Sequence, residues 1–192
     1  MGRAPSRLPR TGTNNAGLML NNVFLCDGYL MKVRYYRGSP DGSAYLGIWK
    51  VMEEGRYALR EKIELPPAPI GVQTVDVPRV FVNRGDFIGI HYPRGLPQGV
   101  VVSALREDNL VRENELYYTY SLPIYDEDIT PNVPIDAKQL GGEVVRSTYG
   151  LEVTILPGKE TSQPVPTLIP PELEDDLIER EGIMNRCKNR LS

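Results

Sequence analysis

The sequence predicts an all-β protein: an antiparallel β-sandwich of jelly-roll type, extended at its C-terminus by a proline-rich linker and a short helix. Three observations carry this prediction. Apolar residues alternate with polar ones at a period of two in several segments, as in a strand with one buried face. Turn-forming residues separate these segments, and no convincing helical periodicity interrupts them before residue 157. With 192 residues, of which 41% are hydrophobic, the chain can bury one substantial core.

The N-terminal segment, residues 1–15, is basic and rich in proline, glycine and asparagine. Such a composition offers little apolar surface to bury, so we expect this segment to be flexible. The sandwich domain is expected to span residues 16–156, because all the strand-like segments fall within that range.

Four segments show the alternation of a strand that is buried on one face. In residues 29–35, apolar odd positions alternate with lysine and arginine, and residues 57–65 alternate in the same way with charged residues. Residues 116–122 and 149–155 repeat the pattern with polar residues between the apolar ones. We expect each segment to be an amphipathic strand of an antiparallel sheet.

Three other segments, residues 44–51, 87–92 and 100–105, are apolar at both odd and even positions. Strands that are covered on both faces have this composition, so these three are predicted to be central strands. The longest connection, Pro123 to Gly142, contains a run of acidic residues and is predicted to be an ordered loop.

The composition changes after residue 156. Residues 157–170 contain four prolines together with serine, threonine and glutamine, which predicts an extended linker. Residues 171–190 begin with proline and acidic residues and end with basic ones, as expected of a helix aligned with its dipole. The apolar positions of this predicted helix are the best candidates for contact with a partner protein: Leu173, Leu177, Ile178 and Met184.

The order of several short motifs resembles a known family. The motifs are Cys26-Asp27-Gly28-Tyr29, Ile48-Trp49, Tyr57-Ala58-Leu59 and Gly85-Asp86-Phe87-Ile88-Gly89. In that order they resemble a β-sandwich domain that recurs in invertebrate multidomain extracellular proteins. The resemblance covers about residues 22–105 and, more loosely, residues 143–155. It implies a sandwich fold in an adhesive or matrix setting, and it supplies no catalytic residue.

Composition excludes two kinds of partner. The net charge is −3 and the basic residues are scattered, so we expect no nucleic-acid partner. No apolar run reaches the roughly 18 residues of a membrane-spanning helix, so we expect no transmembrane segment. The resemblance predicts an extracellular or secreted protein, but residues 1–12 lack the apolar core of a secretion signal, which keeps the cytoplasm as an alternative. The two cysteines, Cys26 and Cys187, are compatible with a bridge or with free thiols.

Enzymatic chemistry has one candidate residue, His91, which is the only histidine of the chain. No nucleophile elbow, phosphate-binding loop or zinc-ligand spacing accompanies it. A lone histidine in an apolar strand is more often structural than catalytic. We therefore predict that the chain is not an enzyme and has no catalytic residue, with an enzyme using His91 as a remote alternative.

Arg84, Gly85 and Asp86 spell the tripeptide that integrins recognise. Recognition requires the tripeptide to be exposed at a loop tip. The competing interpretation is a tight turn before the strand at residues 87–92, in which glycine supplies a positive φ angle and aspartate bonds to the backbone. We favour the turn and retain adhesion as an alternative.

Two further sets of residues are candidate binding sites. Carboxylates in the long loop provide the oxygen ligands that calcium prefers, although they lack the spacing of a dedicated calcium loop. Tyrosines can stack on sugar rings. The candidate metal ligands are Asp126, Asp128 and Asp136, and the candidate glycan-stacking residues are Tyr35, Tyr36, Tyr45 and Tyr118.

Together these patterns predict a non-enzymatic structural or adhesive module that binds protein partners, within a homo- or hetero-assembly or an extracellular matrix. The alternative is a lectin-like module that binds carbohydrate through exposed tyrosines. No cofactor is predicted, and calcium is the alternative.

Overall fold

The computed structural model describes residues 2–9, 16–53, 55–95, 100–108, 111–112 and 115–159. Within these ranges strands are the predominant secondary structure, and the helical elements are short 3₁₀ turns. No helix in the described ranges is long and apolar enough to cross a membrane. The elements are β1 (Ala16–Val23), β2 (Gly28–Arg37), β3 (Ala44–Glu53), β4 (Arg56–Leu65), β5 (Gly71–Val82), β6 (Phe87–His91), β7 (Ser103–Leu105), η1 (Arg106–Asp108), β8 (Tyr117–Leu122), η3 (Asp126–Asp128), β9 (Pro134–Asp136), β10 (Glu143–Tyr149) and β11 (Leu151–Pro157).

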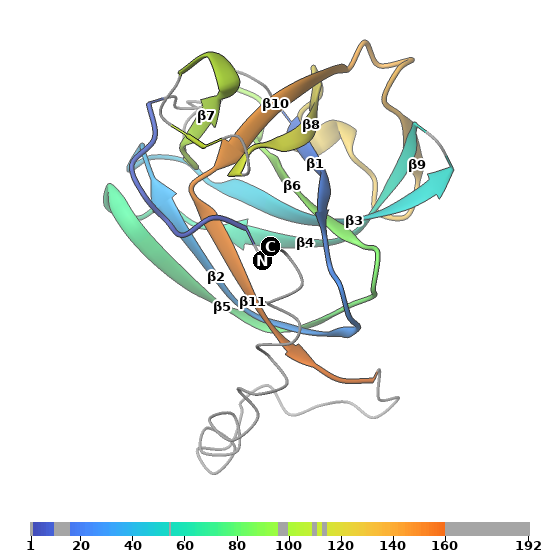
Figure 1. Cartoon of the computed structure of the whole chain (residues 1–192), viewed down its shortest axis with the longest axis horizontal. Helices are drawn as coiled ribbons and strands as arrows, with labels where there is room; N and C mark the ends of the chain where they lie inside the picture. Colours follow the sequence, from blue (N-terminus) through green and yellow to red (C-terminus); the bar gives the residue numbers. More distant parts are fainter. Residues whose placement is uncertain are drawn as a thin grey trace.

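The strands form two sheets, and every strand pair is antiparallel. The larger sheet has eight strands in the order β7-β10-β8-β1-β6-β3-β4-β9, and the smaller has three in the order β11-β2-β5. Figure 1 shows the small sheet packed against the large one, with the chain passing repeatedly between them. The predicted all-β antiparallel sandwich is therefore confirmed. The predicted linker from residue 160 and the predicted C-terminal helix lie outside the described residues.

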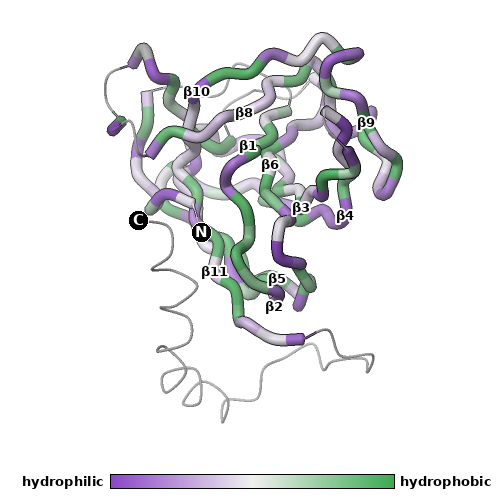
Figure 2. Tube along the Cα trace, turned by 45° about the vertical axis from the view of Figure 1, so that its right-hand side comes forward, coloured by the Kyte–Doolittle hydropathy of each residue, from purple (hydrophilic) through white to green (hydrophobic). Residues whose placement is uncertain are grey.

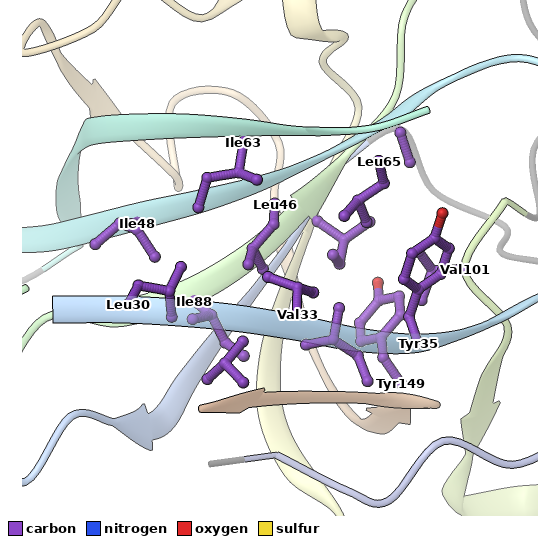
Figure 3. Close-up of a cluster of buried hydrophobic side chains, with 14 of the residues drawn as sticks. Leu30, Val33, Tyr35, Leu46, Ile48, Ile63, Leu65, Ile88, Val101 and Tyr149 are labelled. Atoms are coloured by element: carbon purple, nitrogen blue, oxygen red, sulfur yellow. The ribbon is translucent and has the colours of Figure 1, made fainter. Parts of the chain in front are cut away.

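The main core lies between the two sheets. Alternate residues of the facing strands are buried there, including Leu30 and Val33 of β2, Leu46 of β3 and Ile88 of β6. Figure 3 shows these side chains pointing toward one another from the two sheets. A β-bulge between Leu30 and Lys32 shifts the parity of β2, so the strict odd-position alternation predicted for residues 29–35 holds only after the bulge. Figure 2 shows hydrophobic residues interspersed with hydrophilic ones along β1 and the strands of the small sheet.

A second apolar cluster lies on the outer face of the large sheet, away from the small sheet. We call it the Trp49 cluster. Its members come from β1, β3, β4, β6 and β8 and from the segment 123–142, which folds back over this face: Ala16, Leu18, Trp49, Tyr57, Leu59, Phe87, Tyr120, Leu122, Ile124, Ile129 and Ala137. Because the segment contains η3 and β9, the connection predicted as a loop also supplies an edge strand to the large sheet. The central strands β3 and β6 are thus covered on both faces, as predicted.

One expectation differs from the structure. Residues 100–105 were expected to form a central strand, yet β7 is three residues long and lies at the edge of the large sheet. Its apolar residues are buried because the N-terminal segment covers them, with Leu8 packing against Val102 and Ala104. Residues 2–9 of the N-terminal segment lie along the sandwich, where Arg3 donates its N–H to the Leu151 carbonyl at 2.8 Å.

Candidate functional site

Side chains able to carry chemistry gather at one place on the outer face of the large sheet. Alternation along β3 and β6 turns Tyr45 and His91 toward this face, and the strand register places the two residues opposite each other. Lys62 reaches the same place from β4, and Asp126 reaches it from η3. The fold thus brings together four ionisable groups from three strands and one turn, which are far apart in the sequence.

The four groups form a connected network. The Asp126 carboxylate accepts a hydrogen bond from His91 Nδ1 at 2.8 Å and another from Lys62 Nζ at 2.8 Å. An ionised carboxylate can only accept, so His91 carries its proton on Nδ1 and its lone pair on Nε2. The Tyr45 ring stacks on the imidazole with 5.9 Å between the ring centroids, and the Lys62 ammonium lies 4.5 Å from the centre of the Tyr45 ring. Each group is therefore oriented by at least one neighbour.

The surroundings of the network shift the pKa values of its members. Burial lowers the pKa of His91 below its usual value of 6.5, and the hydrogen bond to Asp126 offsets this only in part. Burial by itself raises the pKa of Asp126, but hydrogen bonds from His91 and Lys62 outweigh it, so this pKa falls below 3.8. Burial and the nearby Glu64 raise the pKa of Tyr45. At neutral pH the imidazole and the phenol are therefore neutral, and Asp126 is a carboxylate.

Trp49 and two glycines close the inner side of this network. Gly47 and Gly89 lie opposite each other on β3 and β6, and the Trp49 indole lies over both. A Cβ atom built on Gly47 would lie 2.9 Å from His91 Nε2 and closer still to Trp49 Nε1. Both nitrogens are buried and have no hydrogen-bond partner among the described residues. The indole N–H and the imidazole lone pair therefore border the same small space above Gly47.

This arrangement resembles the histidine–carboxylate pair of hydrolases in one respect only, the Nδ1 contact with a carboxylate. His91 is 0% exposed, and its free nitrogen points toward Trp49 and Gly47 and away from solvent. A general base must be within hydrogen-bond reach of the group from which it takes a proton. The geometry instead allows His91 to hold Asp126, and with it the start of the segment 123–142, against the sheet.

The candidate calcium ligands do not converge. Asp126 contacts His91 and Lys62, and Asp128 forms an ion pair with Arg94 at 2.9 Å. Asp136 accepts hydrogen bonds from backbone N–H groups two and three residues further along the chain. Among the described residues, no group of three or more potential ligands could hold a metal ion. These carboxylates therefore act as anchors of the segment 123–142.

The tripeptide at residues 84–86 forms the predicted turn. Gly85 has a φ angle of 92°, and the Asp86 carboxylate accepts the backbone N–H of Asn83 at 2.8 Å. Asp86 is 5% exposed and also forms an ion pair with Arg60. An integrin-type partner needs the carboxylate at the surface, whereas here the carboxylate is used inside the protein.

The four candidate glycan-stacking tyrosines do not share a surface. Tyr35 is 0% exposed and belongs to the main core, and Tyr36 packs on the cluster around Leu8. Tyr45 and Tyr118 both lie on the large sheet, but three strand-to-strand steps separate β3 from β8, which amounts to about 14 Å. Tyr118 is 50% exposed, and the Arg146 guanidinium lies 4.6 Å from the centre of its ring.

The proposed partner-binding residues of the tail, Leu173, Leu177, Ile178 and Met184, lie outside the described residues, as does Cys187. Sequence reasoning missed two polar centres. It noted His91 and Asp126 separately, but 35 residues separate them and no spacing rule links them. It also missed Arg37, which is 0% exposed and donates hydrogen bonds to backbone carbonyl groups, because it lies beyond the alternating residues 29–35 and no pattern marks it.

Comparison with protein-family models, with curated proteins and with solved structures gives no match for this chain. Its function therefore has to be argued from its own residues.

Proposed function

We propose that this chain is a non-enzymatic structural or adhesive module that binds protein partners, within a larger assembly or an extracellular matrix. The observation that carries the proposal is the enclosure of His91. The only histidine is completely buried, and its two ring nitrogens face a loop carboxylate and the Trp49 indole. The residues best suited to acid–base chemistry at neutral pH thus stabilise the scaffold.

Exposed side chains of the described residues offer the sandwich a contact surface. Tyr118 and Val144 are half exposed on neighbouring strands of the large sheet, where Tyr118 lies opposite Arg146 and Val144 lies opposite Tyr120. Tyrosine and arginine are enriched among residues that dominate protein–protein binding energies. The apolar positions of the tail, Leu173, Leu177, Ile178 and Met184, are the second proposed contact.

An extracellular setting is part of the proposal. It is supported by the resemblance of residues 22–105 to a sandwich domain of invertebrate extracellular proteins, whose Cys26 motif leads into β2 and whose Trp49 motif lies in β3. Calcium and carbohydrate are not required by this function, since the acidic residues are engaged internally and the tyrosines are dispersed.

The test compares the full chain with a chain that ends at Lys159, where the described sandwich ends. Each is immobilised, and proteins retained from an extract of extracellular matrix are identified and quantified by mass spectrometry. We expect the full chain to retain specific partners that the shortened chain does not. A full chain with serine at Leu173, Leu177, Ile178 and Met184 should lose them as well.

The matched control replaces four polar residues between the sandwich and the predicted helix with alanine: Thr161, Ser162, Gln163 and Thr167. It should retain the same partners as the unmodified chain. Equal retention by the full and shortened chains would move the contact to the sandwich, where Tyr118→Ala should abolish it. Retention of no protein, together with glycan binding that Tyr118→Ala removes, would replace this proposal with the lectin alternative.

A further inference from the structure

Polar contacts at its beginning hold the segment 123–142 in place: three meet at Asp126, and Glu127 and Asp128 bind Arg94 beside them. The Asp126 carboxylate contacts His91 and Lys62, and its backbone N–H donates to the Tyr92 carbonyl at 2.9 Å. These contacts place Ile124 and Ile129 in the Trp49 cluster. The contacts depend on charge, because two of the three use the ionised carboxylate.

The second half of the segment is held differently. β9 pairs with β4 through backbone groups, with Tyr57 opposite Ile135. Asn132 donates its N–H to the Leu59 carbonyl at 2.7 Å, and Ala137 donates to the Gly55 carbonyl at 3.0 Å. Backbone groups do not titrate, so acid leaves this half in place. One continuous segment therefore has a charge-dependent start and a charge-independent end.

We propose that His91 and Asp126 form an acid-sensitive latch that releases residues 123–130 from the outer face of the large sheet when the pair takes up a proton. The release is local, because β9 continues to hold the segment from residue 134 onward. It uncovers apolar side chains of the Trp49 cluster that Ile124 and Ile129 cover at neutral pH.

The physical cause is the enclosure of His91 Nε2. A proton added to this nitrogen becomes an N–H donor beside the Trp49 indole, which is itself only a donor, and the described residues provide no acceptor for it. An unsatisfied buried donor is unfavourable, and more so when it carries charge. The Lys62 ammonium adds repulsion, and burial already keeps the pKa of His91 low. Release of residues 123–130 would expose His91 to water. This would give the new N–H donor a water acceptor, weaken the repulsion by Lys62 and reduce the burial of the imidazole.

The charged groups around the pair act on His91 in opposite directions. Lys62 from β4 disfavours a positive charge on His91, while Asp126 from η3 favours it. Tyr45 from β3 stays neutral because its pKa is raised, and Glu64 of β4 lies opposite Tyr45. β1 contributes Ala16 opposite His91 and no ionisable residue. Protonation of Asp126 at still lower pH removes the remaining acceptor and opens the same contact.

The chain contains its own reporter, because Trp49 is the only tryptophan and packs edge-on against His91 with 6.1 Å between centroids. We expect Trp49 emission to fall and shift to the red as the pH is lowered from about 8 to about 5, while far-ultraviolet circular dichroism stays constant. Hydrogen exchange, corrected for the intrinsic effect of pH, should accelerate in residues 123–130 and stay unchanged in residues 134–142. For each unit by which the pKa of His91 differs between the closed and open forms, protonation should change the ratio of open to closed protein about tenfold.

Two variants test the assignment to this pair. His91→Gln keeps a side-chain amide that can donate to Asp126 but does not titrate, so the transition should disappear. Lys62→Met, at a side chain that is 37% exposed, removes one of the two side-chain contacts that hold the Asp126 carboxylate, so the weakened latch should open with a midpoint at higher pH. Lys32→Met is the matched control: it removes the same charge from the small sheet, where Lys32 pairs with Asp76, and should leave the midpoint unchanged.

Three results would overturn the proposal. The first is an unchanged Trp49 signal and unchanged exchange in residues 123–130 over the whole pH range. The second is equal acceleration of exchange in residues 123–130 and 134–142, which would indicate global unfolding. The third is a midpoint that Lys62→Met and Lys32→Met shift equally. Lys62→Met keeps the test decisive if His91→Gln fails to fold, and none of these results depends on partner binding by the tail.

Discussion

Position 47 has to be glycine because two aromatic side chains lie directly above it. Its strand partner across the sheet is Gly89, and together they leave room for the Trp49 indole and the His91 imidazole. We expect Gly47→Ala to lower the free energy of unfolding by about 1–3 kcal/mol, because the new methyl group overlaps two buried rings. Urea unfolding followed by circular dichroism measures this change.

The control for this substitution is Gly158→Ala. A Cβ atom there would meet only the Tyr29 ring, at the ordinary contact distance of 3.7 Å. Its effect on stability should stay within about 0.5 kcal/mol. A Gly47→Ala protein as stable as the Gly158→Ala protein would show that the Trp49 cluster can yield at this point.

Arg37 is a buried cation whose partners are mainly backbone groups. Its guanidinium donates to four carbonyl oxygens in two connections between strands: those of Pro40, Asp41, Gly42 and Pro66. We expect Arg37→Met to cost about 3 kcal/mol, since the carbonyl groups lose their donors without gaining access to water. Arg34→Met on the same strand removes a half-exposed arginine paired with Glu152 and should cost less than about 1 kcal/mol. Equal costs in thermal or urea unfolding would contradict this role of Arg37.

The sequence alone could not predict which residues pair with each other in the site. The strands of Tyr45 and His91 are apolar at both odd and even positions, so only the strand register shows that the two residues share a face. The partner of His91 comes from a connection 35 residues away, and only the path of that connection determines which carboxylate arrives. Asp86 shows the opposite case, because the turn chemistry of Gly85-Asp86 is local and was predicted correctly.

At the scale of elements, residues 2–9 of the N-terminal segment are held against the sandwich by backbone and side-chain contacts. Gly2 forms a bridge with Glu152 of β11, Arg3 pairs with Glu115 at 3.2 Å, and Leu8 is buried beside Val102. We expect Leu8→Ala to lower the free energy of unfolding by about 2 kcal/mol, because it opens a cavity under the segment. Arg7→Ala, at the exposed neighbouring position, should change it by less than about 0.5 kcal/mol.

Calorimetry or urea unfolding of the two variants decides this point. A Leu8→Ala protein as stable as the Arg7→Ala protein would mean that residues 2–9 contribute nothing to the folded state. Composition predicted a flexible segment here because a single leucine among basic residues and prolines gives no periodic signal. What anchors the segment is the free edge of β11 and the apolar surface of residues 102–104, neither of which can be inferred from residues 1–15.

At the scale of the whole molecule, the sandwich follows from alternation and turns, since these are properties of consecutive residues and recur along the chain. The strand order does not follow from them. Residues 149–155 read as one amphipathic strand, yet the chain crosses between sheets at Gly150, and β10 and β11 lie in different sheets. The Trp49 cluster could not be predicted for the same reason. Alternation within strands cannot show that residues 123–142 cover the outer face of the large sheet.

Proton linkage makes the stability of the whole molecule depend on pH in a calculable direction. The folded pKa of His91 lies below 6.5, so between these values the unfolded chain binds more protons than the folded one. Stability therefore rises with pH across that window, and the contribution of His91 is complete above 6.5 and lost as the pH falls toward the folded pKa. The folded pKa of Asp126 lies below 3.8, so its contribution is present above that value and is lost as the pH falls through the folded pKa.

Urea unfolding of the intact chain from about pH 8 to about pH 5 isolates the histidine window from that of the carboxylate. The free energy of unfolding should decrease toward the acid end in the unmodified protein, and His91→Gln should flatten this slope whatever its stability at neutral pH. Asp128→Asn is the control, because its carboxylate is exposed and pairs with Arg94 without contacting His91. If His91→Gln does not change the dependence of the free energy of unfolding on pH, the acid sensitivity comes from other groups. The network around Asp126 then contributes packing that does not depend on pH.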